Sequence, residues 1–179
     1  MKDQIQHILA AFLVTCLASS AYADLPDVSF ASIDGGQLHM SDWNGRPVLV
    51  VNTASQCAFT DQYEELQALY DTYRDEGLVV LAVPSDDFQQ ELDTAAEVKE
   101  FCDMAFGLDL PMTDITSVRG AHAHPLYRAV QSDTGFVPRW NFNKVLFGKD
   151  GDVIATWGSR TSPMSAPVRR AVSEAFSLD

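Results

Sequence analysis

The sequence predicts an α/β protein built on a central mixed β-sheet flanked by helices. Two apolar runs, V-L-V-V from residue 48 and L-V-V-L-A-V at 78–83, predict buried strands, and residues 61–76 between them place apolar side chains at helical spacing. This strand, helix, strand order is a βαβ unit whose strands pair in parallel. Residues 145–157 add two apolar runs around a turn at 148–151, which predicts an antiparallel hairpin.

Turn and cap residues predict the other elements. Residues 27–40 predict a hairpin that turns at positions 34–36, and Gly77 is the expected stop of the helix over 61–76. Three further helices are predicted, one from Asp93 or Thr94 toward Gly107, one over residues 125–131, and one over residues 165–176 with Ser165 as its cap. With the final hairpin at the edge of the sheet, this order of elements predicts a thioredoxin-like fold.

Length and composition indicate one domain with one buried core. The chain has 179 residues, 46% of them hydrophobic, which is too short for two ordinary domains. The net charge of −13 disfavours nucleic acids and anionic membrane surfaces as partners, because both would repel the chain. The sequence has no phosphate loop or dinucleotide fingerprint, so no cofactor is predicted. His122 and His124 lack a nearby carboxylate or cysteine pair, so no metal site is predicted.

The first 23 residues predict a signal peptide. Lys2 precedes an apolar stretch over residues 8–18, and A-Y-A at 21–23 supplies the small residues that signal peptidase requires. We therefore expect residues 24–179 to form a single exported, periplasmic domain with no stable membrane insertion after cleavage. The alternatives are a buried N-terminal helix and a lipid anchor at Cys16. Cleavage would leave Cys57 and Cys102 as the cysteines of the mature chain.

Cys57 lies at a strand-to-helix turn, a position suited to chemistry. The strand from residue 48 runs into it, and Thr60 and Asp61 then signal the start of a helix. Free N–H groups and the positive end of the helix dipole favour the thiolate, which is the nucleophilic form of cysteine. The alternatives are a small buried hydrophobe and, by default for two cysteines in an exported protein, a structural disulfide. The turn favours a redox role.

Several segments resemble one known family. Residues 52–60, N-T-A-S-Q-C-A-F-T, resemble the N-V-A-S-x-C-G-x-T signature of the glutathione peroxidase family. Three later segments are similar to its W-N-F-x-K block, its A-H-P-L-Y segment and its closing motif; they are residues 140–144, 123–127 and 161–163. The matches occur in the family order and extend over residues 27–176.

The resemblance implies an enzyme that reduces hydrogen peroxide or organic hydroperoxides. Cys57 would attack the O–O bond and become a sulfenic acid, while Trp140, Asn141 and a glutamine complete the family's active site and stabilise the leaving oxygen. The family motif F-P-x-N-x-F-G-G-Q-E-P-G is one residue shorter here and lacks its glycine pair and its Pro-Gly. Alignment on Q-E identifies the glutamine as Gln90, with Gln89 as the alternative.

Cys102 is expected to resolve the sulfenic acid. Residues 98–102, V-K-E-F-C, are similar to the family's I-K-E-F-C, where two-cysteine members keep their resolving cysteine. Its thiolate would close a disulfide with Cys57, and local unfolding would accompany this step because Cys102 is helical and distant. The two-cysteine pattern favours a thioredoxin-like reductant over glutathione. The alternative for Cys102 is a core cysteine.

Other functions compete with this interpretation. A thiol-disulfide oxidoreductase usually shows C-x-x-C at this turn, whereas residues 57–60 are C-A-F-T. A peroxiredoxin would need threonine where the chain has Ala54. An exported redox sensor or relay would use the same first step without high turnover. The segment from Pro125 to Trp140 is short where tetrameric family members carry an insertion, so the resemblance implies a monomer or a loose dimer.

Overall fold

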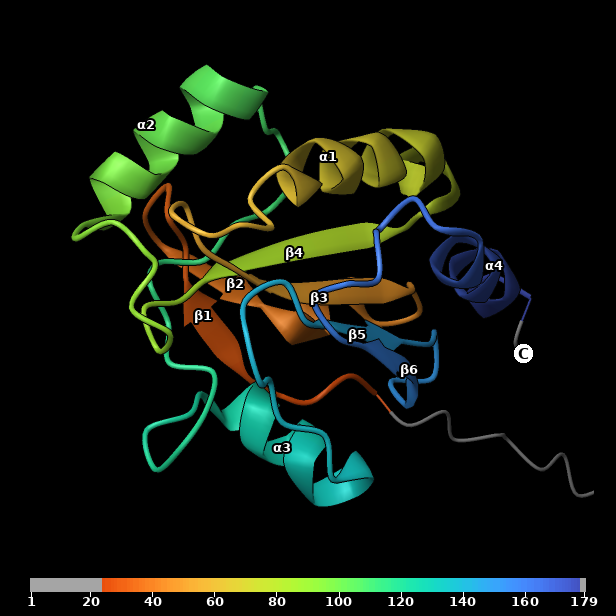
Figure 1. Cartoon of the computed structure of the whole chain (residues 1–179). Coiled ribbons are helices and arrows are strands. Elements are labelled where there is room, and N and C mark those ends of the chain that lie inside the picture. Colours follow the sequence, from red (N-terminus) through yellow and green to blue (C-terminus); the bar gives the residue numbers. More distant parts are fainter. Residues whose placement is uncertain (1–23, 178–179) are drawn as a thin grey trace, which may run out of the picture.

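A mixed β-sheet forms the centre of the computed structural model, which describes residues 24–177; the predicted signal peptide lies outside the described residues. The order of its strands is β4-β3-β5-β6. They are β3 Val48–Thr53, β4 Val79–Pro84, β5 Lys144–Phe147 and β6 Val153–Trp157. β3 pairs in parallel with β4 and antiparallel with β5, which confirms the mixed sheet (Figure 1).

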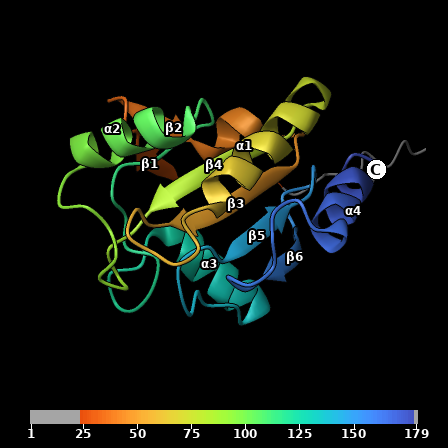
Figure 2. The ribbon, with the colours of Figure 1, turned by 45° about the horizontal axis from the view of Figure 1, so that its top comes forward.

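Helices cover both faces of this sheet. They are α1 Gln62–Tyr73, α2 Ala95–Phe106, α3 Pro125–Thr134 and α4 Ala166–Ala175. α1, α2 and α4 lie on one side and α3 on the other (Figures 1 and 2). Within residues 24–177, no helix has the length and apolar character needed to cross a membrane.

The strand residues alternate between two cores. Leu49 and Val51 of β3 pack with α1, α2 and α4, whereas Val48 and Val50 pack with α3. Every residue of β3 is buried as a result. Coverage on both faces is why the strand has an unbroken apolar sequence instead of a polar alternation.

A separate two-stranded hairpin packs beside the central sheet. β1 Ser29–Ala31 pairs antiparallel with β2 Gln37–His39, as predicted, and Gly35 and Gly36 form the turn with φ values of 87° and 77°. Glycine reaches this left-handed region without the steric cost that a side chain would add. Phe30 of β1 belongs to the same core as the apolar face of α3.

Some helix ends differ from the sequence predictions. The helix predicted over 61–76 ends at Tyr73 as α1, and a 3₁₀ turn over Arg74–Glu76 leads to Gly77. α3 continues to Thr134, beyond residue 131, and ends where Gly135 adopts a left-handed conformation with φ 73°. Its last turn is exposed and polar, so it gives no apolar periodicity to detect. Ser165 stands at the N-cap of α4, but its hydroxyl donates to the Ser162 carbonyl at 2.6 Å instead of accepting a helix N–H.

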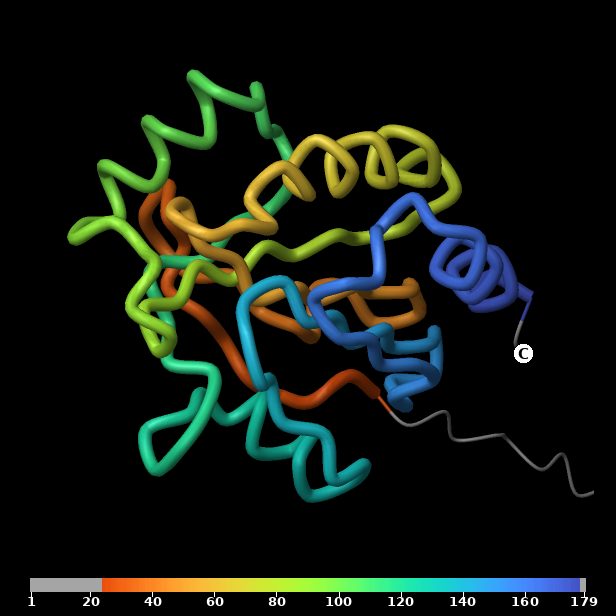
Figure 3. Tube along the Cα trace, in the orientation of Figure 1, coloured from red at the N-terminus to blue at the C-terminus, as the bar shows by residue number. Residues whose placement is uncertain are grey.

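Three loops meet at one end of the sheet (Figure 3). The parallel strands β3 and β4 both end there, and the antiparallel strand β5 begins there. Hydrogen bonds join the loops: the Gln56 N–H donates to the Gln90 carbonyl at 2.9 Å, and the Phe142 N–H donates to the Asn52 carbonyl at 2.5 Å. The segments that carry the predicted site residues 57, 90, 140 and 141 are therefore neighbours.

Candidate active site

Cys57 lies in a tight turn organised by Thr60. The Thr60 hydroxyl accepts the Cys57 N–H at 3.0 Å and lies 2.7 and 3.0 Å from the carbonyl oxygens of Cys57 and Ala54. The Phe59 N–H donates to Cys57 Sγ at 3.4 Å, and the cysteine is 9% exposed. α1 begins only at Gln62, so the sulfur faces an N–H of the turn that precedes the helix. Such a donor favours the anionic form of the sulfur.

Gln90 and Asn141 are hydrogen bonded to each other beside this turn. Asn141 Nδ2 donates to Gln90 Oε1 at 3.1 Å, and the Gln90 carbonyl accepts the N–H of Gln56, the residue before Cys57. Asn141 is fully buried, whereas Gln90 is half-buried. The bond from Asn141 engages the acceptor oxygen of the Gln90 amide. The NH₂ group of the same amide is then the part of Gln90 that can donate a hydrogen bond to another molecule.

Gln89, the alternative from the sequence, has a different position. It lies at the tip of the loop with φ 57°, its side chain is exposed, and its N–H closes a turn to the Asp86 carbonyl at 2.9 Å. The structure therefore brings Gln90, and not Gln89, to Asn141. Adjacent side chains diverge because a left-handed residue turns the chain sharply.

Trp140 borders two shallow hollows on the surface. Its side chain is 41% exposed and its ring packs against Phe88 with centroids 5.4 Å apart. One hollow, of about 360 Å³, continues toward Phe136 and Arg139, and the other, of about 420 Å³, lies beside Phe59. These hollows offer apolar contacts together with a cationic side chain next to the exposed indole.

Two asparagines that sequence reasoning did not assign fix the turn of Trp140 and Asn141. Asn52 Nδ2 and Asn143 Nδ2 donate to the Trp140 carbonyl at 3.0 and 2.8 Å, and Asn52 Oδ1 accepts the Asn143 N–H at 3.0 Å. They hold Phe142 at φ 58°, a conformation that costs energy for a residue with a side chain. The sequence signal for this role was a polar residue, Asn52, at the end of an apolar strand, because a buried amide needs hydrogen-bond partners.

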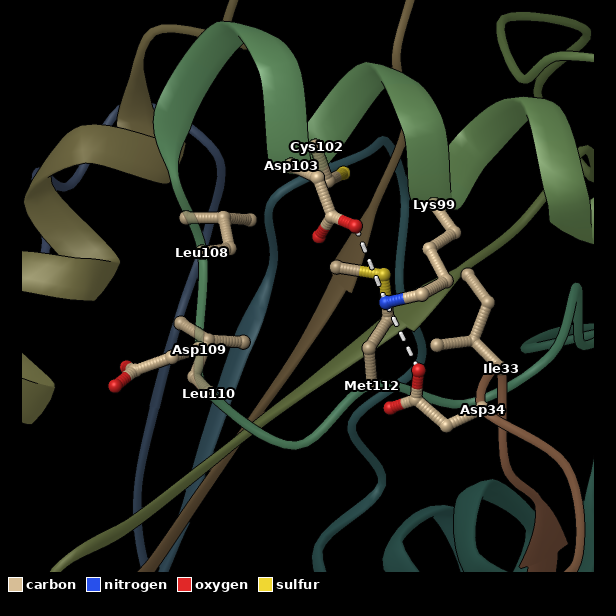
Figure 4. A pocket seen from close by; sticks show the side chains of 9 residues that line it. All are labelled: Ile33, Asp34, Lys99, Cys102, Asp103, Leu108, Asp109, Leu110 and Met112. Atoms are coloured by element: carbon tan, nitrogen blue, oxygen red, sulfur yellow. Dashed lines mark ion pairs between the residues drawn. The ribbon is translucent and has the colours of Figure 1, made fainter.

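Cys102 lies on the buried face of α2 and forms no disulfide with Cys57. It is 1% exposed, and burial raises the pKa of its thiol to about 12. Both cysteines are free thiols. Cys102 lines a hollow of about 170 Å³ at which Lys99 of α2 pairs with Asp34 of the hairpin turn at 2.9 Å and with Asp103, one turn further along α2, at 3.2 Å (Figure 4). In this structure Cys102 is a buried free thiol, and its role as the resolving cysteine stays a prediction.

Lys144 links β5 to the start of α1 and to the segment before α4. This fully buried residue of β5 donates from Nζ to Gln62 Oε1, at the start of α1, and to the Thr161 carbonyl at 2.8 Å. Gln62 Nε2 in turn donates to the Ser159 carbonyl at 2.6 Å. Burial lowers the pKa of Lys144 to about 7, an effect opposed by the charge of Glu65.

His124 serves the fold. Its Nδ1 accepts the Leu126 N–H at 3.3 Å at the start of α3, its Nε2 lies 2.9 Å from the Ser29 carbonyl, and its ring stacks on Phe30 at 3.8 Å. Burial lowers its pKa, which fits a neutral ring that accepts at one nitrogen and donates at the other. In the part of the chain that the structure describes, no three His, Cys, Asp or Glu side chains are arranged to hold a metal ion.

Comparisons with known proteins identify the family of this chain. The family model described as glutathione peroxidase matches residues 25–131. A glutathione peroxidase from Lactococcus lactis subsp. cremoris is 39% identical over 143 residues, covering 76% of this chain and 90% of the relative. The crystal structure of Trgpx in its apo form matches with a TM-score of 0.68 and 30% identity, covering 90% of this chain and 98% of that one.

A more distant neighbour defines the fold. A thiol:disulfide interchange protein of the thioredoxin family from Chlorobium tepidum TLS matches with a TM-score of 0.65 over 89% of this chain and 99% of its own. Its identity of 17% indicates a shared fold alone. The family model covers more than half of the chain. The chain therefore belongs to the glutathione peroxidase family, whose members are peroxidases, and it has a thioredoxin-like fold.

Proposed function

We propose that this chain is an exported thiol peroxidase that reduces hydrogen peroxide or organic hydroperoxides through Cys57. The observation that carries the proposal is the environment of the sulfur. The Phe59 N–H donates to Cys57 Sγ at 3.4 Å, and the bonded amides of Gln90 and Asn141 lie beside the same turn. Donors in such an arrangement stabilise negative charge on sulfur and on a departing oxygen.

In the first step, the Cys57 thiolate attacks one oxygen of the hydroperoxide. An S–O bond forms as the O–O bond breaks, and the electron pair of that bond goes to the leaving oxygen, which takes up a proton and departs as water or an alcohol. Sulfur is oxidised by two electrons to the sulfenic acid. We assign the Gln90 amide and the Trp140 indole N–H as donors to the leaving oxygen, and Asn141 as the residue that holds Gln90.

In the second step, the Cys102 thiolate attacks the sulfenic sulfur, so an S–S bond forms and hydroxide leaves as water. α2 has to detach first, because Cys102 is 1% exposed. Detachment also removes the burial that raises the pKa of this thiol to about 12, so one motion both exposes and activates it. A thioredoxin-like protein or glutathione then reduces the disulfide.

The remaining features of the proposal concern location and assembly. We infer that residues 1–23 are a signal peptide, that residues 24–179 act as one periplasmic domain, and that this domain is a monomer or a loose dimer. The apolar stretch over 8–18 with A-Y-A at 21–23 supports export. The mature protein should begin at Asp24, and an intact mass that retains residues 1–23 in the exported fraction would contradict this.

A peroxide-consumption assay with thioredoxin and glutathione compared side by side tests the function. We expect turnover with at least one reductant and none in a Cys57→Ser variant, because serine supplies no thiolate at neutral pH. Substantial activity in that variant would refute the proposal. A single stoichiometric reaction without turnover would instead fit a redox sensor, and disulfide exchange without peroxide consumption would fit a thiol-disulfide oxidoreductase.

A further inference from the structure

We propose that Glu91 is a positioning residue whose side chain holds the Cys57 turn in register with Gln90. The proposal rests on the proposed function of Cys57 and assigns a further residue to the same site. Glu91 directly follows Gln90, yet it is 7% exposed and forms no ion pair within residues 24–177, which is unusual for a carboxylate. Its role lies in the hydrogen bonds that the carboxylate accepts.

The loop after β4 holds two consecutive peptide groups of the Cys57 turn. Glu91 Oε1 accepts the Ser55 N–H at 2.9 Å, and the Gln90 carbonyl accepts the Gln56 N–H, also at 2.9 Å. One attachment uses a side chain and the other uses the main chain. Two attachments at adjacent residues fix both the position and the orientation of the turn, whereas one alone would leave it free to rotate.

Glu91 is itself held firmly. Its Oε1 also accepts the N–H of the next residue, Leu92, at 2.9 Å, and its own N–H donates to Asp86 Oδ1 at 3.2 Å. The neighbouring Asp87 accepts the Val118 N–H at Oδ2 at 2.6 Å, which ties the loop to the segment that precedes α3. The loop is therefore a rigid support on which the Gln90 amide and the Glu91 carboxylate have a fixed separation.

The buried position of the carboxylate is costly, so the accepted hydrogen bonds have to offset it. Burial raises the pKa of Glu91, while the N–H groups of Leu92 and Ser55 that donate to its carboxylate lower it. Among residues 24–177, Oε2 has no hydrogen-bond partner, and neither do the hydroxyls of Ser55 and Tyr63. A neutral glutamine could accept the Ser55 N–H through its carbonyl oxygen and direct its NH₂ group toward these hydroxyls. The reach of the oxygen, and not the charge, is thus the property that positions the turn.

Three substitutions separate reach from charge. Glu91→Gln keeps the reach and removes the charge, Glu91→Asp keeps the charge but is one methylene too short for the Ser55 N–H, and Glu91→Ala removes both. We expect the second-order rate constant for peroxide with Glu91→Gln to stay within about threefold of the unaltered chain. We expect about a 10- to 100-fold loss for Glu91→Asp and Glu91→Ala, because small misplacements in an active site cost up to about 10²-fold.

The control and the second measurement make the test decisive. Glu97→Ala alters another glutamate, the one in the exposed capping box of α2, and should leave the rate unchanged. Hydrogen exchange of the Ser55 and Gln56 amides should accelerate in Glu91→Asp and not in Glu91→Gln. This readout is independent of activity. If the unaltered chain does not react with peroxide but the exchange pattern appears, the proposed function fails and the positioning role stands.

The remaining outcomes would overturn the inference. A slow Glu91→Gln beside a normal Glu91→Asp would mean that charge, and not the bond to Ser55, sets the rate. Equal losses in both would point to general packing, and unchanged rates in both would show that Glu91 does not act on the turn. Glu91→Asp and Glu91→Gln are conservative enough to fold, so the comparison stands even if Glu91→Ala does not.

Discussion

Gln89→Ala and Gln90→Ala are the same substitution at adjacent positions, and we expect very different effects from them. Gln90 Oε1 accepts from Asn141 Nδ2 at 3.1 Å, and Asn141 is fully buried. Without Gln90, both ends of the Asn141 amide lack a partner among the described residues, because Asn141 Oδ1 already has none. The side chain of Gln89 is exposed and makes none of these contacts.

The expected magnitudes follow from these contacts. Loss of one preorganised donor should slow the reaction of Cys57 with peroxide about 10- to 1,000-fold. The unpaired, buried Asn141 amide should lower the free energy of unfolding by about 1–3 kcal/mol. Gln89→Ala removes an exposed side chain from a left-handed position without relieving or adding strain, so its rate should change less than about twofold and its free energy of unfolding by less than about 0.5 kcal/mol.

Stopped-flow mixing of the reduced protein with excess peroxide provides the assay. Loss of the Cys57 thiol is followed by rapid thiol labelling at several peroxide concentrations, and denaturant unfolding gives the stability of each variant. Equal, small effects on the rate would show that no loop glutamine acts on the leaving oxygen. Equal, large effects would assign the loss to the loop as a whole, and either result would refute the reasoning.

Three further predictions address α2 and the buried lysine. Cys102→Ser should react once with peroxide and then over-oxidise at Cys57, seen as sulfinic acid by mass spectrometry, because its sulfenic acid has no internal partner; normal turnover with thioredoxin would contradict this. Asp34→Asn removes the ion pair of Lys99 with the hairpin and should speed disulfide closure after a peroxide pulse by about two- to fivefold, since exposed pairs are weak; Asp103→Asn, which leaves that link intact, is the control. The pKa of Lys144 is about 7 in the folded chain and 10.5 ordinarily, so between these pH values the unfolded chain binds more protons and Lys144 should make the free energy of unfolding rise with pH. A Lys144→Met variant measured across this window should lack that contribution. Parallel stability curves for the two chains would contradict this prediction.

The fold was predictable where local chemistry and burial coincide. The run from Val48 is apolar because both faces of β3 are covered. Gly107 ends α2 in a left-handed conformation, and Gly77 does the same for the 3₁₀ turn Arg74–Glu76 that follows α1. Thr94 begins α2 through a capping box with Glu97, which lies within the sequence range predicted for that start. The end of α3 was not predictable, since its last turn is exposed and carries no pattern.

The site was predictable in its residue types but not in its contacts. Cys57, Trp140 and Asn141 lie in motifs that are visible in the sequence. The bond between Gln90 and Asn141 joins positions 51 apart, and the shortened loop leaves two adjacent glutamines that only the backbone conformation separates. The same holds for Glu91, because its partner is a main-chain N–H and therefore leaves no mark on the sequence of the turn.

In the proposed mechanism, the burial of Cys102 also sets the order of the two chemical steps. While α2 is docked, the thiol has a pKa of about 12 against an ordinary value of 9.0, so at neutral pH about a thousandfold less thiolate is present than in an exposed cysteine. An open state with one molecule in a hundred would still hold about tenfold more Cys102 thiolate than the docked majority. In the proposed mechanism, resolution would therefore proceed through the open state even when that state is rare. We expect Cys57 to be oxidised first, because docked Cys102 would not compete for peroxide, and we expect the free energy of α2 detachment to set how long the Cys57 sulfenic acid persists.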